Sequence, residues 1–514
     1  MNEMAKDATR NGLLVLTAAL ALGVLGDALL RTAPPGLNVF LWIGALAGVY
    51  LALRHFNALP AAGQGRWLLL PALLLAAGFL WRDSPALQLL DVLGLAVLLG
   101  LASAYSRGGD LRRGHILDYG LQLVLAGLQA AAGPLPLLAA DIQWSRLPQR
   151  GRRNGTLAVL RGLLLALPLL LIFGSLFMAA DAVFADAVHR LFNFRMVDLT
   201  ADVAMTLAWA WLAAGWLRAA GRGKGAESLA VTRPGSLTMG AIETGVVLGS
   251  LNLLFLAFVV VQFRYFFGGA ALVQAATGLT YADYARRGFF ELTGVTALVL
   301  PVLLIGHWLQ PQPVTSDQGE SPQQPPYQQA SQQRLFRVLA ATLLALLFVI
   351  MISAVQRMLL YQRAFGLTEL RLYASALMIW LGVLFMWFAA TVLRGREKPF
   401  AFGALASGVV LLLTLHAINP DALIVRTNVG RMAAGQTFDA TYVASLGADA
   451  VPALVEALPA MDPADRKAVA AQVLSRWSPP ENADWRGWNW GRVQAGRAVR
   501  AGMDDLREAA QTGQ

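Results

Sequence analysis

Charged side chains inside long apolar stretches are the residues of this sequence most able to do chemistry. Five of them interrupt runs that otherwise consist mainly of Leu, Ala, Val and Ile: Asp27, Asp91, Arg161, Glu243 and Glu291. A charge at the centre of a bilayer costs about 2.5–3.5 kcal/mol on insertion scales, so such residues usually line an interior path or pair with each other. They predict a path for an ion or a small solute. The structural alternative is an Asp–Arg pair, or a side chain that reaches the interface from a helix end.

Position within each stretch helps to separate these interpretations. Asp27 and Glu243 lie within one helical turn of a predicted span end, which favours the structural alternative for both. Asp91 lies deeper, and Arg161 could pair with a carboxylate near one membrane face. Asn252 lies deep in an apolar run, where its amide predicts either a cavity lining or a hydrogen bond between helices.

A polar ladder follows Gly278-Leu279-Thr280. Thr280, with Asp283 three residues later, approximates a capping box, which predicts the start of a helix. Asp283, Arg287 and Glu291 follow at a spacing of four residues, so on a helix they form one ladder of alternating charges. Such a ladder would enter the bilayer edge already neutralised. Two aromatic residues of the kind found at membrane interfaces lie beside it: Tyr281 and Tyr284.

A second stretch resembles the first, because Gly366-Leu367-Thr368 again leads into an apolar run. It carries comparable polar and aromatic residues: Arg357, Tyr361, Thr368 and Arg371. One interpretation is a weak internal repeat, of the kind many transporters carry. The other is chance combined with shared helix-start chemistry. Both predict that a helix begins directly after Gly-Leu-Thr.

These two stretches, together with residues 168–184 and Asn419-Pro420-Asp421-Ala422-Leu423-Ile424, resemble a bacterial family of polytopic inner-membrane proteins. That family is known as a domain of unknown function. The resemblance covers roughly residues 90–455 and is most specific around 281–292 and 357–374. It implies a location in the inner membrane, and it assigns neither an activity nor catalytic residues.

Common catalytic and cofactor signatures are absent from the sequence. Gly221-Arg222-Gly223-Lys224-Gly225 lacks the spacing and the Ser/Thr of a phosphate-binding loop, and no Gly-x-Ser-x-Gly motif occurs. The five histidines are far apart, without a His-x-x-x-His pair, and the chain has no cysteine. We therefore expect no enzyme activity, no metal and no cofactor.

The elements that must position the polar residues are transmembrane helices. The chain has 514 residues, 57% hydrophobic and 14% charged, whereas soluble proteins have about 25% charged residues. About 20 apolar residues are needed to span a bilayer as a helix, the structure that satisfies the backbone within one segment. The sequence predicts an all-α polytopic bundle with spans at 12–30, 37–53, 67–81, 85–105, 156–180, 199–219, 240–266, 288–309, 335–355, 370–393 and 399–418.

The segment 117–140 is apolar enough for a twelfth span but contains Gly127, Gly133, Pro134 and Pro136. Proline breaks a helix, so the alternative is a segment that re-enters without crossing. Re-entry keeps most loop arginines on one side, as the positive-inside rule requires. We therefore predict eleven spans, an uncleaved first span, a cytoplasmic N-terminus and a C-terminus outside a bacterial inner membrane.

Composition divides the chain into four parts. Residues 1–309 hold eight spans, 310–334 form a Pro/Gln-rich linker predicted to be disordered, 335–418 hold three spans, and 419–514 form a helical tail. In the tail, Asp449 and Asp462 are the predicted N-caps of a helical hairpin. Its tryptophans suit a membrane interface, with sugar stacking as the alternative: Trp477, Trp485, Trp488 and Trp490.

Two functions from different classes fit this pattern. The first is a transporter or permease for a small solute or ion, because the chain combines many spans, a candidate repeat and intramembrane carboxylates. The second is a non-transporting membrane scaffold or sensor subunit that acts through its tail on a protein partner. An integral-membrane transferase is a third class, but no catalytic cluster supports it. The net charge of +10 lies mostly in short loops, so the expected partner is the lipid bilayer and no nucleic acid is expected.

Overall fold

The computed structural model describes residues 2–60, 63–144, 194–222, 239–277, 281–310, 326–478 and 484–511, together with 162, 177, 180 and 181. Every regular element in these residues is a helix. The helices form two compact units. The first comprises residues 1–83, 87–230 and 480–493, and the second comprises 84–86, 231–479 and 494–514.

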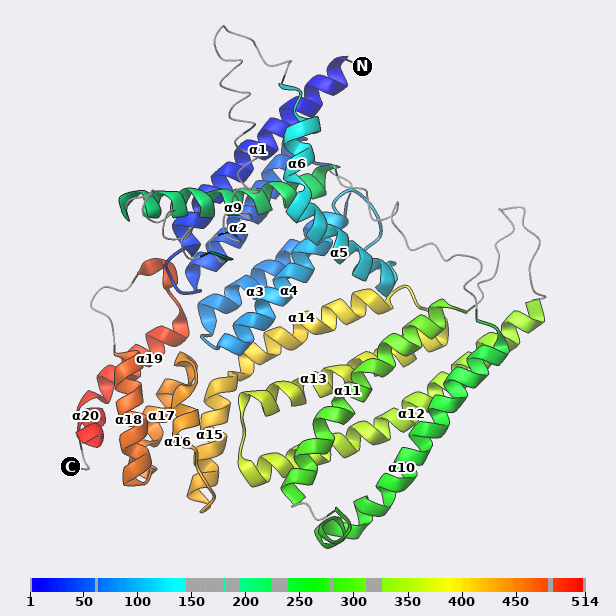
Figure 1. Cartoon of the computed structure of the whole chain (residues 1–514), viewed down its shortest axis with the longest axis vertical. Helices are drawn as coiled ribbons and strands as arrows, with labels where there is room; N and C mark the ends of the chain where they lie inside the picture. Colours follow the sequence, from blue (N-terminus) through cyan, green and yellow to red (C-terminus); the bar gives the residue numbers. More distant parts are fainter. Residues whose placement is uncertain are drawn as a thin grey trace. The chain divides into compact units, whose positions relative to one another are not determined.

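The first unit is a bundle around α1 (Asn2–Leu30). Its other helices are α2 (Leu37–His55), α3 (Leu69–Trp81) after a 3-10 turn at Gly65–Leu68, α4 (Pro85–Ala104), α5 (Ile116–Ala132), α6 (Pro134–Pro136) and α9 (Phe194–Arg222). Figure 1 shows α1 beside α2 and α9, which are its main packing partners. Tyr50 of α2 packs edge-on against Trp216 of α9, with ring centroids 5.6 Å apart, in the buried centre of the unit.

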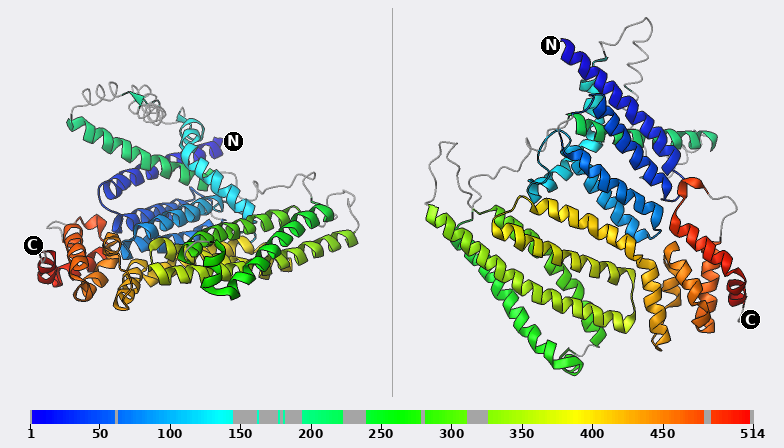
Figure 2. Two further views of the ribbon diagram at one scale, coloured as in Figure 1. Left: turned by 60° about the horizontal axis from the view of Figure 1, so that its bottom comes forward. Right: turned by 180° about the vertical axis from the view of Figure 1, so that it is seen from behind.

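The second unit contains five long helices and most of the tail. The long helices are α10 (Ala241–Thr277), α11 (Tyr281–Trp308), α12 (Pro326–Phe365), α13 (Glu369–Thr391) and α14 (Phe400–Ile418). Helices α10, α11 and α13 all pack on α12 (Figure 1). The tail helices are α15 (Pro420–Ala433), α16 (Ala440–Ser445), α17 (Val451–Ala457), α18 (Pro463–Trp477) and α20 (Met503–Gln511), and α19 (Trp490–Ala501) belongs partly to each unit. Both views of Figure 2 show the orange helices of the tail side by side.

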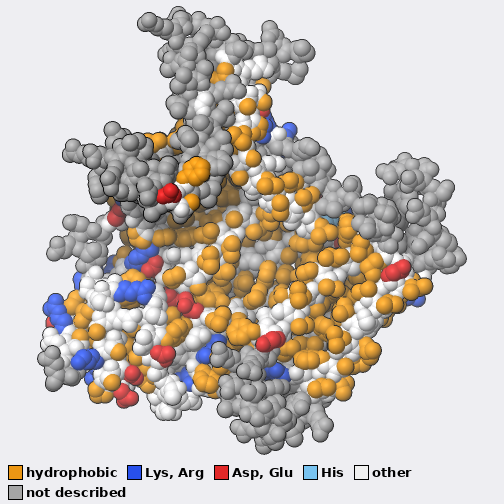
Figure 3. Space-filling view, viewed as in Figure 1, with side chains coloured by type: hydrophobic (Ala, Val, Ile, Leu, Met, Phe, Trp, Pro, Cys, Tyr) orange, Lys and Arg blue, Asp and Glu red, His pale blue; other side chains and the backbone are white. Residues whose placement is uncertain are grey.

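The long helices cross a membrane. Nine helices of the described residues are long and apolar enough to span a bilayer, and they match nine of the predicted spans. The predicted span 67–81 lies in a shorter apolar helix, Gly65–Trp81, and 156–180 falls outside the described residues. Figure 3 shows hydrophobic side chains over the long helices of the second unit. The exposed apolar side chains of these helices include Leu298 of α11 and Ile379 of α13. Water would not tolerate so large an apolar surface, so the chain is a multi-pass integral membrane protein.

The segment Ile116–Asp141 is bent by 48° between Ala132 and Pro134. Past the bend, Gln143 N–H donates to Thr9 Oγ1 at 3.2 Å, beside the first residues of α1. Before α5, Leu111 N–H donates to Gln64 Oε1 at 3.1 Å, in the loop between α2 and α3. Since α1 and α2 are antiparallel neighbours, these two helix ends lie on one side. The contacts favour re-entry over crossing, which stays a prediction.

Two boundaries differ from the sequence predictions. The predicted disordered linker is too long at its C-terminal end, because α12 already begins at Pro326, where proline is favoured as the first helical residue; residues 311–325 are not described. Asp462 does precede Pro463 at the start of α18. Asp449 is not an N-cap, because it lies within a 3-10 turn and is buried.

Candidate functional site

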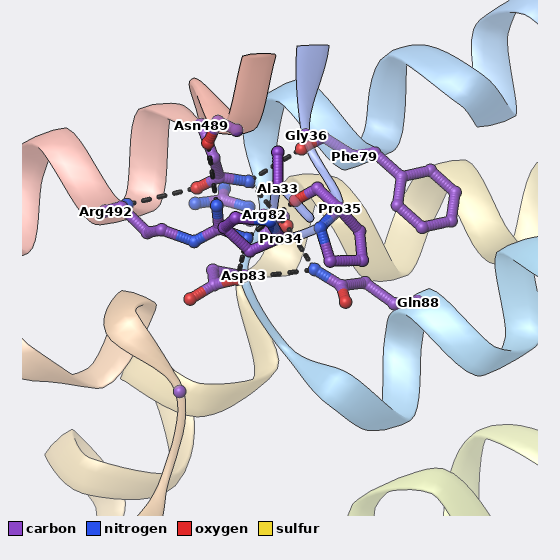
Figure 4. Close-up of polar contacts among 12 residues, drawn as sticks. Ala33, Pro34, Pro35, Gly36, Phe79, Arg82, Asp83, Gln88, Asn489 and Arg492 are labelled. Carbon is purple, nitrogen blue, oxygen red and sulfur yellow. Dashed lines mark hydrogen bonds and ion pairs between the residues drawn. The ribbon is translucent and has the colours of Figure 1, made fainter. Parts of the chain in front are cut away.

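Two polar clusters of the described residues lie where the tail meets the ends of membrane helices. The first is a helix-end clasp, formed by residues 484–492 of the first unit (Figure 4). A 3-10 turn at Trp485–Gly487 is started by Asp484, whose side chain accepts from Arg486 N–H. This turn leads directly into Trp488 and Asn489, whose polar groups bind the ends of α2 and α3.

Several contacts of the clasp satisfy backbone groups that helix ends leave without a partner. Arg486 Nη1 donates to the carbonyl of Ala28 in the last turn of α1, at 2.5 Å. Trp488 O accepts from Leu37 N–H at the start of α2, at 2.9 Å. The clasp therefore caps the α1–α2 hairpin from both sides of its turn.

Asn489 is the centre of the clasp. Its buried side chain donates through Nδ2 to Phe79 O at 2.7 Å and to Arg82 O at 2.9 Å, which caps the C-terminus of α3 (Figure 4). Its Oδ1 accepts from the backbone N–H of Arg492 at 3.0 Å. Arg492 in turn forms an ion pair with Asp83 at 2.8 Å. No other residue type offers this combination of two donors and an acceptor at the same size.

The second cluster, the tail junction, lies in the second unit around Asp421. This side chain is fully buried in the first turn of α15. Ser84 Oγ donates to Asp421 Oδ1 at 3.1 Å, and Gly447 N–H donates to Oδ2 at 3.1 Å. One carboxylate thus joins the residue before α4, the helix that follows the last span, and the tail hairpin.

Burial and two neighbouring carboxylates make Asp421 titrate near neutral pH. Burial raises the pKa of Asp421 most, Glu369 and Asp449 raise it further, and the two hydrogen bonds lower it, so that it reaches about 7. An isolated charge in such a place is costly, so a buried carboxyl with few donors holds its proton. The tail junction therefore changes charge at a pH where an exposed Asp does not.

The loop between α12 and α13 is also held by the tail. Asn428 of α15 accepts from Leu367 N–H and donates to Leu367 O, both at 2.8 Å. Gly366 has φ of +78°, and a Cβ there would lie 2.5 Å from Asn428 Oδ1. Tyr442 Oη accepts from Glu369 N–H at 2.7 Å, at the start of α13. The second Gly-Leu-Thr stretch is thus a docking point for the tail.

Arginines complete this loop at the C-terminus of α12. Arg431 Nη1 donates to Gln362 O at 3.1 Å, and Arg371 Nη1 donates to Phe365 O at 3.0 Å. The Arg371 guanidinium also stacks on the Tyr361 ring, 4.0 Å from its centroid. Cations are favoured at the negative end of a helix dipole. Thr368 is the N-cap residue of α13 by backbone conformation, without a side-chain cap.

The predicted path residues fall into different environments. Asp91 is buried in α4, inside the first unit. Asp27 lies 3.9 Å from Arg31, and Arg31 also pairs with Asp202 of α9, which agrees with the structural alternative. Asn252 Nδ2 donates to Leu339 O of α12 at 3.0 Å, so this amide joins two helices.

Two of the predicted carboxylates do not line an interior. Glu243 lies exposed in the first turn of α10, and Glu291 lies exposed on α11. Arg357, predicted to belong to the second stretch, is buried in α12 and donates to Gln262 Oε1 at 2.6 Å. The structure therefore leaves Asp91 as the interior carboxylate among the described candidates.

The first Gly-Leu-Thr stretch is described only in part. Helices α11 and α13 begin at Tyr281 and Glu369, each directly after Gly-Leu-Thr, as both interpretations predicted. The following predicted residues, or their side chains, lie outside the described residues: Arg161, Thr280, Tyr281, Asp283, Tyr284 and Arg287. The charge ladder and the internal repeat remain predictions.

Residues 69–319 and 324–457 match DUF4153, a domain of unknown function. The chain belongs to the DUF4153 family. This match covers the range of the predicted resemblance and includes both the α12–α13 loop and Asp421. No curated protein and no solved structure matches the sequence, so the DUF4153 assignment brings no activity with it.

Sequence reasoning missed the central residues of both clusters. Asp421 belongs to the Asn419-Pro420-Asp421 sequence that carries part of the family resemblance. Its position directly after a predicted span was a signal that could have identified it as a functional residue. Asn489 stands between two tryptophans and gave no signal of its own. In the residues that the structure describes, no group of three or more His, Asp or Glu side chains could hold a metal ion.

Proposed function

We propose that this DUF4153 protein is a non-transporting membrane scaffold or sensor subunit that acts through its C-terminal tail. The observation that carries the proposal is Asp421, a buried carboxylate that holds Ser84 and Gly447 together. Loss or gain of one proton at Asp421 changes the contact between a membrane-helix end and the tail. A change of charge near neutral pH can therefore alter how the tail is held, which is what a sensor requires.

The remaining contacts support a tail held at fixed points. Asn428 and Tyr442 bind the backbone on either side of Thr368 in the α12–α13 loop of the second unit. In the first unit, Asn489 caps α3. A surface fixed by several hydrogen bonds presents a partner with a defined shape at a low entropic cost. The proposed partner is a protein that binds the tail helices.

Transport of a small solute or ion is the second candidate. Asp91 is buried in an apolar span, and the bent segment Ile116–Asp141 has the shape of a re-entrant element. Irregular backbone at membrane depth occurs where it is buried in protein or lines a water-filled cavity. Against transport, Glu243 and Glu291 are exposed, and Asn252 serves a contact between helices.

A pair of measurements on the full chain in liposomes and nanodiscs separates the two functions. Proton or ion flux into dye-loaded liposomes is compared between wild type and Asp91→Asn. Hydrogen exchange of the tail amides is compared across pH between wild type and Asp421→Asn. The sensor proposal expects no flux in either protein and a pH response of the tail that the Asp421→Asn variant lacks. Flux that Asp91→Asn abolishes would replace it with transport.

We further propose that the tail lies outside the inner membrane. In the first unit, the contacts of Arg486 and Asn489 with the C-terminal ends of α1 and α3 support a place for this part of the tail opposite the N-terminus of α1. The chain lacks cysteine, so Ser475→Cys on the exposed face of α18 gives one thiol. Labelling of intact bacterial cells by a reagent that reaches the periplasm but not the cytoplasm is expected. Labelling only after lysis would reverse the orientation.

A further inference from the structure

Four exposed indoles belong to the helix-end clasp and to the helix α3 that it caps, in the first unit. Trp485, Trp488 and Trp490 are 61%, 44% and 39% exposed, and Trp81, the last residue of α3, is 45% exposed. Tryptophan is highly buried on average, so four exposed indoles on one short stretch and the helix end it caps indicate a contact outside the chain. We call these four side chains the indole patch.

The backbone contacts of the clasp fix the depth of the indole patch relative to the membrane helices. Trp488 O accepts from the first N–H of α2, and Asn489 Nδ2 donates to carbonyls on both sides of Trp81. The ends of spanning helices lie where the hydrocarbon core gives way to headgroups. The indole patch therefore lies at headgroup depth, the zone where Trp is enriched in membrane proteins.

The polar contacts of the clasp and its indoles have different surroundings. Asn489 is buried against α3, and a Cβ on Gly487 would lie 2.9 Å from the ring of Pro34. This side of the clasp is therefore closed by protein. The indoles, in contrast, are exposed, and the Arg82 guanidinium stacks over the Trp81 ring, 4.7 Å from its centroid. An apolar ring beside a cation matches the boundary between acyl chains and phosphates.

We infer that the indole patch binds the lipid surface of the same membrane that α1, α2 and α4 span, which makes residues 484–492 a peripheral membrane anchor. The occupant is a bilayer because Trp81 continues the exposed apolar face of α3 that carries Leu74, seven residues earlier on the same helix. This anchor does not depend on the proposed sensor function. Stacking on a soluble sugar or on a partner protein would place the same indoles in water or in a protein contact.

Depth measurements by spin labelling test the inference on the full chain. The natural lack of cysteine allows single substitutions Trp485→Cys, Trp488→Cys and Trp490→Cys, each labelled with a nitroxide in nanodiscs. Leu89→Cys, at a 62% exposed position of α4, gives the reference for lipid. Arg113→Cys, in an exposed loop, gives the reference for water.

The expected result is a ratio of oxygen to nickel-chelate accessibility between the two references at all three positions. Water-like ratios equal to that of Arg113→Cys would overturn the inference, as would low access to both reagents, which indicates a protein contact. A second measurement avoids any fold defect of the labelled variants. Lipids brominated near the headgroup should quench wild-type fluorescence more than that of the triple variant Trp485→Phe, Trp488→Phe, Trp490→Phe, and equal quenching would contradict the anchor.

Discussion

Replacing Asp421 with Asn should remove a pH dependence from the stability of the tail. Asn keeps the size of the side chain and an oxygen that accepts from Ser84, but it cannot accept from Gly447 N–H through its amide nitrogen. It also cannot ionise. The variant therefore separates the charge of Asp421 from its packing.

The direction of this pH dependence follows from how tightly Asp421 binds its proton in the folded tail and in the opened tail. In the folded tail the pKa of Asp421 is raised to about 7, mainly by burial, from its ordinary value of 3.8. A raised pKa means that the folded state holds the proton more tightly than the opened state does. The stabilisation of the folded tail by protonated Asp421 is complete below the ordinary pKa and is lost as the pH rises to about 7. Above that pH the carboxylate is charged in both states and the loss is complete.

The size of the pH-dependent loss of stability follows from the same pKa shift of Asp421. Each pKa unit corresponds to about 1.4 kcal/mol, so a shift of roughly three units gives a loss of about 4 kcal/mol in the free energy of opening. Removal of one hydrogen bond by Asn costs about 1 kcal/mol at all pH values. At low pH the variant should therefore be less stable than wild type, and near neutral pH it should be more stable.

Hydrogen exchange of the tail amides in nanodiscs, corrected for the intrinsic rate at each pH, measures this free energy. The control is Asp504→Asn, an exposed carboxylate in the first turn of α20, which should keep the wild-type pH dependence. Equal slopes in wild type and Asp421→Asn would refute the assignment of the pH dependence to this side chain. A wild-type tail that gains stability with rising pH would refute the sign.

Three further substitutions test the contacts that hold the tail. Asn489→Ala leaves two carbonyls at the end of α3 without their donor, so the melting temperature should fall by an amount corresponding to about 1–3 kcal/mol. An unchanged melting temperature would show that the clasp is not closed in solution. Gly366→Ala places a Cβ at positive φ against Asn428, which should cost about 1–2 kcal/mol or more in thermal unfolding, whereas Gly430→Ala, where a Cβ meets nothing, is the matched control. Tyr442→Phe removes the acceptor of Glu369 N–H and should speed exchange of that amide severalfold; exchange at the wild-type rate would contradict the contact.

The membrane helices were predictable because their cause is local. Each span must be apolar along its whole length, so composition alone identifies it, and α11 and α13 begin where Gly-Leu-Thr predicted. The start of α12 was predicted less well. Pro326 belongs to a polar, proline-rich stretch whose composition indicates disorder, and composition does not show that its last residues continue a buried helix.

The clusters that hold the tail were not predictable because their contacts are distant in the sequence. Asn489 binds a carbonyl 410 residues earlier, and Asp421 accepts from a hydroxyl 337 residues earlier. No periodicity or spacing connects such pairs. Asp91 and Glu291 were both predicted to line a path because each interrupts an apolar stretch, yet Asp91 is buried and Glu291 is exposed. Packing between helices decides which face of a helix is buried, and the apolar stretch alone does not show it.

The contrast between Glu291 and Asp421 shows where a charge change can have an effect in this fold. Glu291 is exposed on its helix, so its protonation alters few contacts within the chain. Asp421 has no exposed surface, and both of its oxygens accept hydrogen bonds from other segments. A ligand, including a proton, shifts an equilibrium only by its difference in affinity between two states. At Asp421 that difference is large because burial separates the two states, and the segments that respond are the tail and the residue that starts a membrane helix.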